Sequence, residues 1–231
     1  LKRDMMDKLY YDQIDLAPYL VQGKNTIAVL VWYWGREGFS HPDTGKGGLL
    51  FDADFDEMKV LSGSDWKIKV QQAYEHSTGG GQPNARLSEW NVRFRASNNN
   101  IEGWQLPDFD DSDWQLATVK GIPPALPWNT LVKRPFPKWF DSGLLDFTNK
   151  STFPKFGNGT PIDAKMPYNA RISAYLKVKA PAGKLINIQT DQYDGWYAFG
   201  DGPAVRAEYI TKDGEQEFET LLWMSGNTVR Y

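Results

Sequence analysis

The chain has 231 residues, a net charge of −3 at pH 7 and no cysteine, a length that suits one large or two modest domains with a hydrophobic core. Its acidic and basic residues are interleaved, which argues against a nucleic-acid partner, and no apolar run approaches the roughly 20 residues that cross a bilayer. The lack of cysteine excludes thiol nucleophiles, thiolate metal sites and disulfides.

Short β-type runs separated by turn residues recur in the first 120 residues, a pattern typical of sandwiches and barrels. Residues 26–34 (TIAVLVWYW) are apolar on both faces and predict a central strand buried on both sides. Residues 49–55 alternate apolar and polar side chains, which predicts a half-buried strand. Residues 66–70 repeat this alternation, with the apolar side chains expected to face inward. Before these runs, Asp15 is expected to cap a single helical turn.

The middle of the chain is rich in proline, with five prolines between residues 121 and 137. Proline excludes an interior strand or a helix there, so this segment is expected to run extended and to mark a domain boundary. Beyond it, residues 171–179 alternate again, with Leu176 and Val178 expected to face inward. Lys212-Asp213-Gly214, between two β runs, predicts a hairpin.

Two strings echo each other, Ser64-Asp65-Trp66-Lys67-Ile68 and Ser112-Asp113-Trp114-Gln115-Leu116. In both, Ser and Asp are expected to brace a turn through bonds from side chain to backbone, and Trp then opens a strand. The echo indicates a shared local motif and does not require a duplicated domain.

The residue types that catalysis needs are sparse. His41 and His76 are the only histidines, and no Gly-x-Ser-x-Gly elbow is present, so the sequence predicts no nucleophilic triad. Asp52, Asp54 and Asp56 share one strand face and carry oxygens of the kind that Ca²⁺ binds, but a solvated strand face is the favoured interpretation. Glycosidases use a pair of carboxylates, and the sequence does not indicate which two of its 29 acidic residues would form one. We therefore assign no catalytic residue, cofactor or metal site.

Several strings, taken in order, resemble a known family. Residues 11–38 (YDQIDLAPYLVQGKNTIAVLVWYWGREG) resemble the D-[LV]-x-x-Y-L-x-x-G-x-N-x-[IL]-A-V pattern of galactose-binding-like jelly rolls in bacterial glycoside hydrolases. The strings GSDWKI, Asn84-Ala85-Arg86, Gly103-Trp104 and PDFDDSDWQLATV follow in the order typical of the N-terminal region of family 78 α-L-rhamnosidases. Residues 206–231 resemble that family's D-x-Y-x-x-x-G…E…F-R-Y hairpin, with Glu208 and Val229 in place of its Asp and Phe.

This resemblance implies an all-β chain with three parts. These are a galactose-binding-like jelly-roll β-sandwich over residues 1–120, truncated at its start, a Pro-rich connection over 121–165, and an incomplete second antiparallel β-sandwich over 166–231. The family's catalytic centre lies in an (α/α)₆ barrel that would follow Tyr231, and this sequence has no long helical patterns for it. The chain is therefore expected to be an accessory, non-catalytic region of an α-L-rhamnosidase-like glycoside hydrolase.

The partners that the resemblance implies are the (α/α)₆ catalytic domain of the same parent chain and a rhamnose-containing oligo- or polysaccharide. It favours a periplasmic or extracellular bacterial location. Two other functions stay open. Measured sugar binding by the isolated chain would favour an autonomous carbohydrate-binding module. A helical catalytic sequence downstream in the parent gene would exclude a structural or adhesion sandwich.

Sugar contacts are expected where a strand ends in an aromatic and polar loop, because aromatic faces stack on pyranose C–H groups and Arg donates to hydroxyls. The candidate carbohydrate-binding residues form two clusters: Trp32, Trp34, Arg36 and His41, and then Asp191, Tyr193, Asp194 and Trp196. For Trp32 and Trp34, a core or interface position is the favoured alternative.

Overall fold

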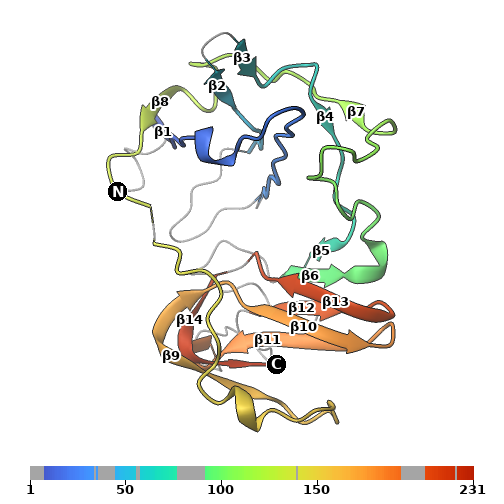
Figure 1. Cartoon of the computed structure of the whole chain (residues 1–231). Coiled ribbons are helices and arrows are strands. Elements are labelled where there is room, and N and C mark those ends of the chain that lie inside the picture. The colour runs from blue at the N-terminus through green and yellow to red at the C-terminus, as the bar shows by residue number, and fades with distance from the viewer. Residues whose placement is uncertain are drawn as a thin grey trace. The chain divides into compact units, whose positions relative to one another are not determined.

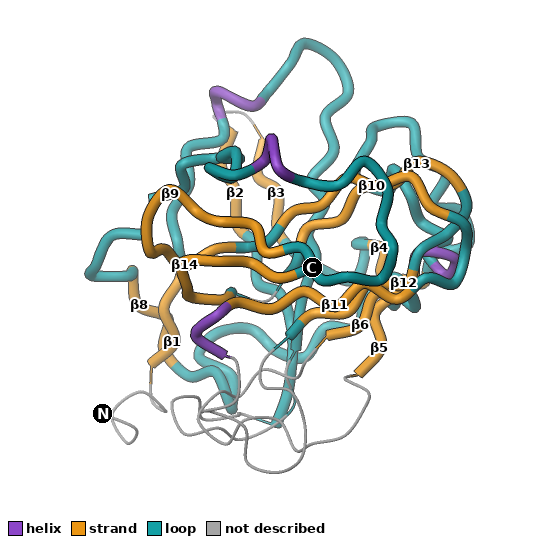
Figure 2. Tube along the Cα trace, turned by 90° about the horizontal axis from the view of Figure 1, so that it is seen from below, coloured by secondary structure: helices purple, strands orange, loops and turns teal. Residues whose placement is uncertain are grey.

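The computed structural model describes residues 8–33, 35, 45–55, 58–76, 92–138, 140–193, 206–221 and 223–231. This part of the chain is nearly all β, as predicted, with a helical share limited to short 3₁₀ turns (Figures 1 and 2). Its strands are β1 (Lys8–Tyr11), β2 (Asp52–Phe55), β3 (Met58–Leu61), β4 (Lys67–Ile68), β5 (Tyr74–His76), β6 (Val92–Arg95), β7 (Gln115–Leu116), β8 (Thr130–Lys133), β9 (Asp163–Ile172), β10 (Tyr175–Ala180), β11 (Leu185–Thr190), β12 (Ala207–Ile210), β13 (Gly214–Glu219) and β14 (Met224–Arg230). The 3₁₀ helices are η1 (Ala17–Tyr19), η2 (Ala96–Asn98), η3 (Lys150–Thr152) and η4 (Asp191–Tyr193).

The chain divides into two compact units, each discontinuous in sequence. Unit 1 comprises Leu1–Val70 and Ile101–Trp139, and unit 2 comprises Gln71–Asn100 and Phe140–Tyr231. The segment Gln71–Asn100 thus leaves unit 1, adds β5 and β6 to unit 2, and returns.

Unit 1 contains three two-stranded sheets in its described residues: β1 with β8 in parallel, and β2 with β3 and β4 with β7 antiparallel. In β2 the side chains alternate between exposed and half-buried, as predicted. The predicted helical turn is also present as η1, where the Asp15 carboxylate accepts a hydrogen bond from the Ala17 N–H at 3.0 Å.

The predicted central strand at residues 26–34 is wrong for its described part. Residues 26–33 are not assigned to a strand, and Val29, Leu30 and Val31 are 40–48% exposed. The run is rich in β-formers, but β propensity expresses packing against neighbouring strands, so such a run does not by itself create a ladder. The inward orientation predicted for residues 66–70 also fails at Ile68 and Val70, which are exposed, because the strand β4 is only two residues long.

The two Ser-Asp-Trp strings pair with each other. Each forms a turn closed by a bond from the Trp N–H to the carbonyl three residues earlier, and each then enters a two-residue strand, β4 or β7. These strands are antiparallel partners, with Lys67 opposite Leu116 and Ile68 opposite Gln115. The Lys67 ammonium reaches the Asp111 carboxylate of the other turn at 2.6 Å. The motif is therefore a local, roughly two-fold pairing.

Unit 2 is built around a six-stranded sheet with the order β5-β6-β12-β11-β14-β9, accompanied by the two-stranded sheet β10-β13. The large sheet is mixed, because β6 runs parallel to β12 while its other pairs are antiparallel. The described strands from β9 to β14 pair antiparallel with one another, as predicted for the second segment. The parallel pair arises because β6 enters from Gln71–Asn100 and no turn links it to β12.

The last strand of the large sheet, β9, carries a proline in its interior. Pro167 lies where the register with β14 shifts, between the pairs Lys165–Thr228 and Ala170–Gly226. An edge strand with such an irregularity tolerates proline, because no ladder N–H is needed there. After the Pro-rich segment, strands of unit 2 resume with β9 at Asp163, earlier than the alternation at residues 171–179 indicates.

The hairpin predicted around Lys212-Asp213-Gly214 is wrong, although both flanking strands exist. The strand β12 pairs with β6 and β11, whereas β13 pairs with β10. The turn leads from one sheet to the other, and the rings of Tyr209 and Phe218 stack at 4.7 Å between centroids. Gln216 fixes the turn, since its amide donates to the carbonyls of Lys212 and Gly214 and accepts from the Lys212 N–H.

One face of the large sheet forms the core of unit 2. Phe94 and Tyr209 are opposite each other in register, and both rings contact Phe218 of the smaller sheet. In β10, Leu176 is buried and Lys177 and Lys179 are exposed, as the alternation predicted. The opposite face of the large sheet carries charged side chains, which are described next.

Candidate functional site

The predicted sugar-binding residues are only partly within the described chain. Trp34, Arg36, His41, Asp194 and Trp196 lie outside the described residues. The described members, Trp32, Asp191 and Tyr193, belong to different units, with Trp32 half-buried in unit 1 and the other two in η4 of unit 2. Sugar binding by either cluster therefore stays a prediction.

Asp191 braces the irregularity in β14. Its carboxylate oxygen Oδ1 accepts hydrogen bonds from the backbone N–H groups of Asn227 at 2.8 Å and Thr228 at 3.2 Å. Burial alone would raise the pKa of Asp191, but these donors outweigh it, so the pKa lies below the usual 3.8. Gly226 fits here because a Cβ at its position would overlap the Asp191 carboxylate and the Thr190 side chain.

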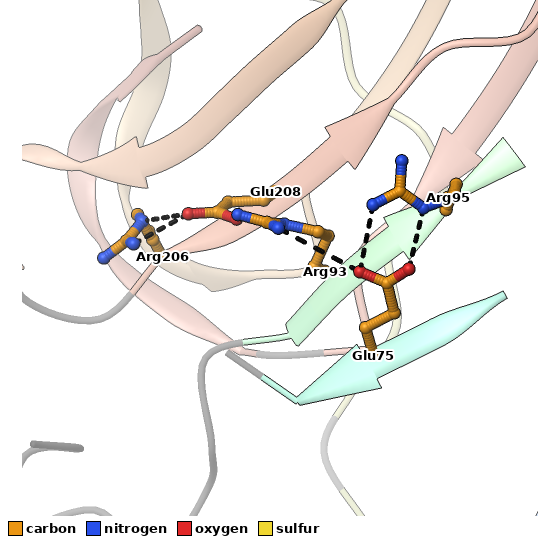
Figure 3. Close-up of polar contacts among 5 residues, drawn as sticks. All are labelled: Glu75, Arg93, Arg95, Arg206 and Glu208. Carbon is orange, nitrogen blue, oxygen red and sulfur yellow. Dashed lines mark hydrogen bonds and ion pairs between the residues drawn. The ribbon is translucent and has the colours of Figure 1, made fainter. Parts of the chain in front are cut away.

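The most developed polar constellation is a row of five alternating charges on the outer face of the large sheet (Figure 3). We call it the charged row; its members, in spatial order, are Arg206, Glu208, Arg93, Glu75 and Arg95. Strand register builds it directly, because Arg93 lies opposite Glu208 in β12 on one side and opposite Glu75 in β5 on the other. Facing residues on neighbouring strands have close Cβ atoms, so their charges pair.

The inner end of the charged row is buried. Arg206 and Glu208 are each 4% exposed. The Glu208 carboxylate accepts from Arg206 Nε at 2.7 Å on one oxygen and from Arg93 Nε at 2.6 Å on the other. A buried carboxylate requires such partners, because burial of an uncompensated charge costs several kcal/mol.

The outer end of the charged row is more accessible. The Arg95 guanidinium donates two hydrogen bonds, of 2.7 and 3.3 Å, to the Glu75 carboxylate. Arg93 Nη1 lies 4.0 Å from the same carboxylate. The hydrogen bond from Arg95 holds the pKa of Glu75 below its usual 4.5, with the charge of Arg93 adding to the effect. Conversely, the Glu75 carboxylate raises the pKa of Arg95.

Chemically, this row holds two carboxylates between guanidinium groups. The pKa of Glu75 is lowered, whereas a glycosidase acid needs a raised pKa. The sequence signal for the row was the alternation of Arg with apolar residues in β6 and the Arg-x-Glu string at residue 206. Sequence reasoning missed it because Arg93 and Glu208 are 115 residues apart.

Metal and membrane features are limited within the described residues. No group of three or more His, Cys, Asp or Glu side chains there could hold a metal ion. Asp52, from the acidic strand face considered for Ca²⁺, lies 3.4 Å from the Lys59 ammonium, and Asp56 is outside the described residues. In the same part of the chain, no helix is long and apolar enough to span a membrane.

Comparison of the chain with protein-family models, with curated proteins and with solved structures gives no match.

Proposed function

We propose that the chain is an accessory, non-catalytic region of an α-L-rhamnosidase-like glycoside hydrolase, in which it supports the catalytic domain and contacts carbohydrate. In this proposal residues 1–120 correspond to a galactose-binding-like jelly roll, residues 121–165 to a Pro-rich connection and residues 166–231 to a second β-sandwich. The partners are an (α/α)₆ catalytic domain of the same parent chain and a rhamnose-containing oligo- or polysaccharide.

The observation that carries the supporting role is the unequal burial of apolar side chains in the two units. Among the described residues, all buried hydrophobic side chains except Ile101 belong to unit 2, while most exposed large hydrophobic side chains belong to unit 1. Burying one such side chain contributes about 1.5–3 kcal/mol. A unit that leaves many apolar side chains exposed would gain stability by packing them against a neighbouring domain. An accessory region of a larger enzyme has such a neighbour in the catalytic domain.

The resemblance adds the enzyme class. Some of its strings coincide with strands of this chain, since the two Ser-Asp-Trp strings lead into β4 and β7 and residues 206–231 contain β12, β13 and β14. The string at residues 11–38 contains no strand beyond Tyr11 in its described part. The charged row supports the proposed non-catalytic role, because each of its two carboxylates is paired with arginine.

The supporting role is tested by joint expression. The chain is produced together with the protein segment that its parent gene encodes downstream, each with its own affinity tag. We expect a helical partner that co-purifies with this chain and hydrolyses p-nitrophenyl α-L-rhamnoside, while this chain alone does not. A downstream segment without helical barrel sequence, or turnover by this chain alone, would overturn the proposal.

An autonomous carbohydrate-binding module is the second candidate, favoured by the 10 Trp, 11 Tyr and 12 Phe of the chain. Titration of the isolated chain with rhamnose and rhamnose-containing oligosaccharides, followed by Trp fluorescence, separates the two. Saturable binding without the catalytic partner supports the module, and unchanged spectra at millimolar sugar support the accessory role.

A further inference from the structure

The exposed segment between η3 and β9 contains the only Asn-Gly pair of the sequence, Asn158-Gly159. Residues 154–162 form neither strand nor helix, and Asn158, Gly159 and Thr160 are all exposed. The Asn158 carbonyl oxygen Oδ1 accepts a hydrogen bond from the Thr160 N–H at 3.0 Å. This bond folds the side chain over the peptide that follows it.

We propose that Asn158 is a site of spontaneous deamidation, with water as the only co-reactant. The backbone nitrogen of Gly159 loses its proton to hydroxide and attacks Asn158 Cγ. The new N–Cγ bond closes a five-membered succinimide, the Cγ–Nδ2 bond breaks, and the amide leaves as ammonia. Water then opens the ring to aspartate or isoaspartate, so the net change is the loss of one ammonia and the gain of one water.

Three features of this segment favour the attack. The bond from the Thr160 N–H polarises the Asn158 side-chain carbonyl and restrains this side chain beside the following residues. Gly159 has no side chain to shield that nitrogen, and its surroundings are open, since a Cβ built there meets no atom within 4 Å. Within the described part of the chain, no hydrogen bond holds the Gly159 N–H.

Asn149 provides an internal contrast on the same approach to β9. Its Nδ2 donates to the Asp163 carbonyl and its Oδ1 accepts from the Lys165 N–H, both at 2.8 Å. These bonds engage both ends of the Asn149 amide. The Lys150 N–H, which would have to attack, donates to the Phe147 carbonyl at 3.2 Å. We therefore expect Asn149 to persist while Asn158 converts.

The experiment incubates the whole folded chain at mildly alkaline pH and follows it by peptide mapping. The expected result is a time-dependent replacement of NH by O in the mass of the peptide that contains Asn158. An acidic species on ion exchange and methyl labelling by an isoaspartyl methyltransferase should accompany it, with no change at Asn149. Gly159→Ala should slow the conversion, because it adds a shielding Cβ.

Two results would overturn the proposal. One is an Asn158 that stays intact in the folded chain while the urea-unfolded chain converts. The other is equal conversion of Asn149 and Asn158 in the folded chain. Both results are measured on the unaltered chain, so they do not depend on the Gly159→Ala variant. This matters because Gly159 has a φ of +87°, a left-handed conformation that alanine would strain.

Discussion

At the scale of single residues, the charged row shows that strand register brings charged residues from distant parts of the sequence into one network. Arg93 is its central member, since it stands between Glu208 and Glu75. Removal of one partner of a buried ion pair leaves the other charge without full compensation. Arg93→Ala should therefore lower the free energy of unfolding by about 3 kcal/mol, measured by urea denaturation at pH 7.

Arg95→Ala is the matched control for this substitution. Arg95 lies two residues away on the same strand face, but its partner Glu75 is only half-buried and keeps Arg93 nearby. We expect a loss of at most about 1 kcal/mol, the usual range for accessible ion pairs. Equal losses for the two variants would contradict the view that the buried end of the row dominates its contribution.

The Glu75 carboxylate also makes stability depend on acid. The hydrogen bond from Arg95 lowers its folded-state pKa below 4.5, while the charge of Glu208 opposes this shift and that of Arg93 supports it. A lowered folded-state pKa means that the contribution is present above about pH 4.5 and is lost as the pH falls through the lower, folded value. Glu75→Gln should thus be less stable than the native chain at pH 7.

Urea unfolding of both proteins at pH 7 and pH 3 measures this effect. The difference between their midpoints should be smaller at pH 3 than at pH 7, because the contribution of the ionised carboxylate is lost as the pH falls below 4.5 toward the lower folded-state pKa. A difference of the same size at both pH values would show that Glu75 acts through its shape and not through its charge.

At the scale of elements, the edge strand β9 is protected by a side chain. The Asn149 amide offers one donor and one acceptor to the backbone of Asp163 and Lys165, as a neighbouring strand would. The Thr148 N–H adds a third bond, to the Lys165 carbonyl. Such coverage blocks the pairing of a free sheet edge with another chain.

Asn149→Ala should uncover this edge. Loss of two backbone hydrogen bonds is expected to cost about 1–2 kcal/mol, and the exposed edge should promote concentration-dependent association. Thermal unfolding and light scattering measure the two effects. Asn158→Ala in the exposed loop is the control and should change neither. Association of both variants to the same degree would contradict the edge role.

The same scale shows what the sequence could predict. Local signals succeeded, such as the Asp15 turn and the inward Leu176 of β10, because they depend on a few adjacent residues. Pairing failed, since nothing near Lys212-Asp213-Gly214 indicates that β12 joins β6 and β13 joins β10. The charged row was missed for that reason, because its contacts depend on pairing between distant segments.

At the scale of the whole molecule, unit 2 depends on a segment that lies, in sequence, between the two parts of unit 1. Gln71–Asn100 supplies β5 and β6, and with them Phe94 for the core and Arg93 for the buried carboxylate of Glu208. Its two ends are tied by a hydrogen bond from the Gln71 amide to the Asn99 side chain at 3.1 Å. The segment therefore belongs to unit 2 structurally although its neighbours in sequence belong to unit 1.

This organisation predicts which shortened chain folds. Residues 71–100 joined to residues 140–231 through a long flexible Gly-Ser linker retain every strand of the large sheet and of the β10-β13 sheet. That protein should unfold in one cooperative urea transition. Residues 140–231 alone lose β6, which leaves Tyr209 without the Phe94 ring and Glu208 without Arg93.

We expect this shorter fragment to bind a hydrophobic dye and to lack a cooperative transition. The linked protein with Arg93→Ala serves as the intermediate case, because it keeps the Phe94 packing and loses only the charge pairing. A fragment 140–231 that unfolds at the same urea midpoint as the linked protein would show that β12 does not need β6 and is held by β11 alone. The core would then lie wholly in the C-terminal segment, and the crossing of Gln71–Asn100 would contribute nothing to stability.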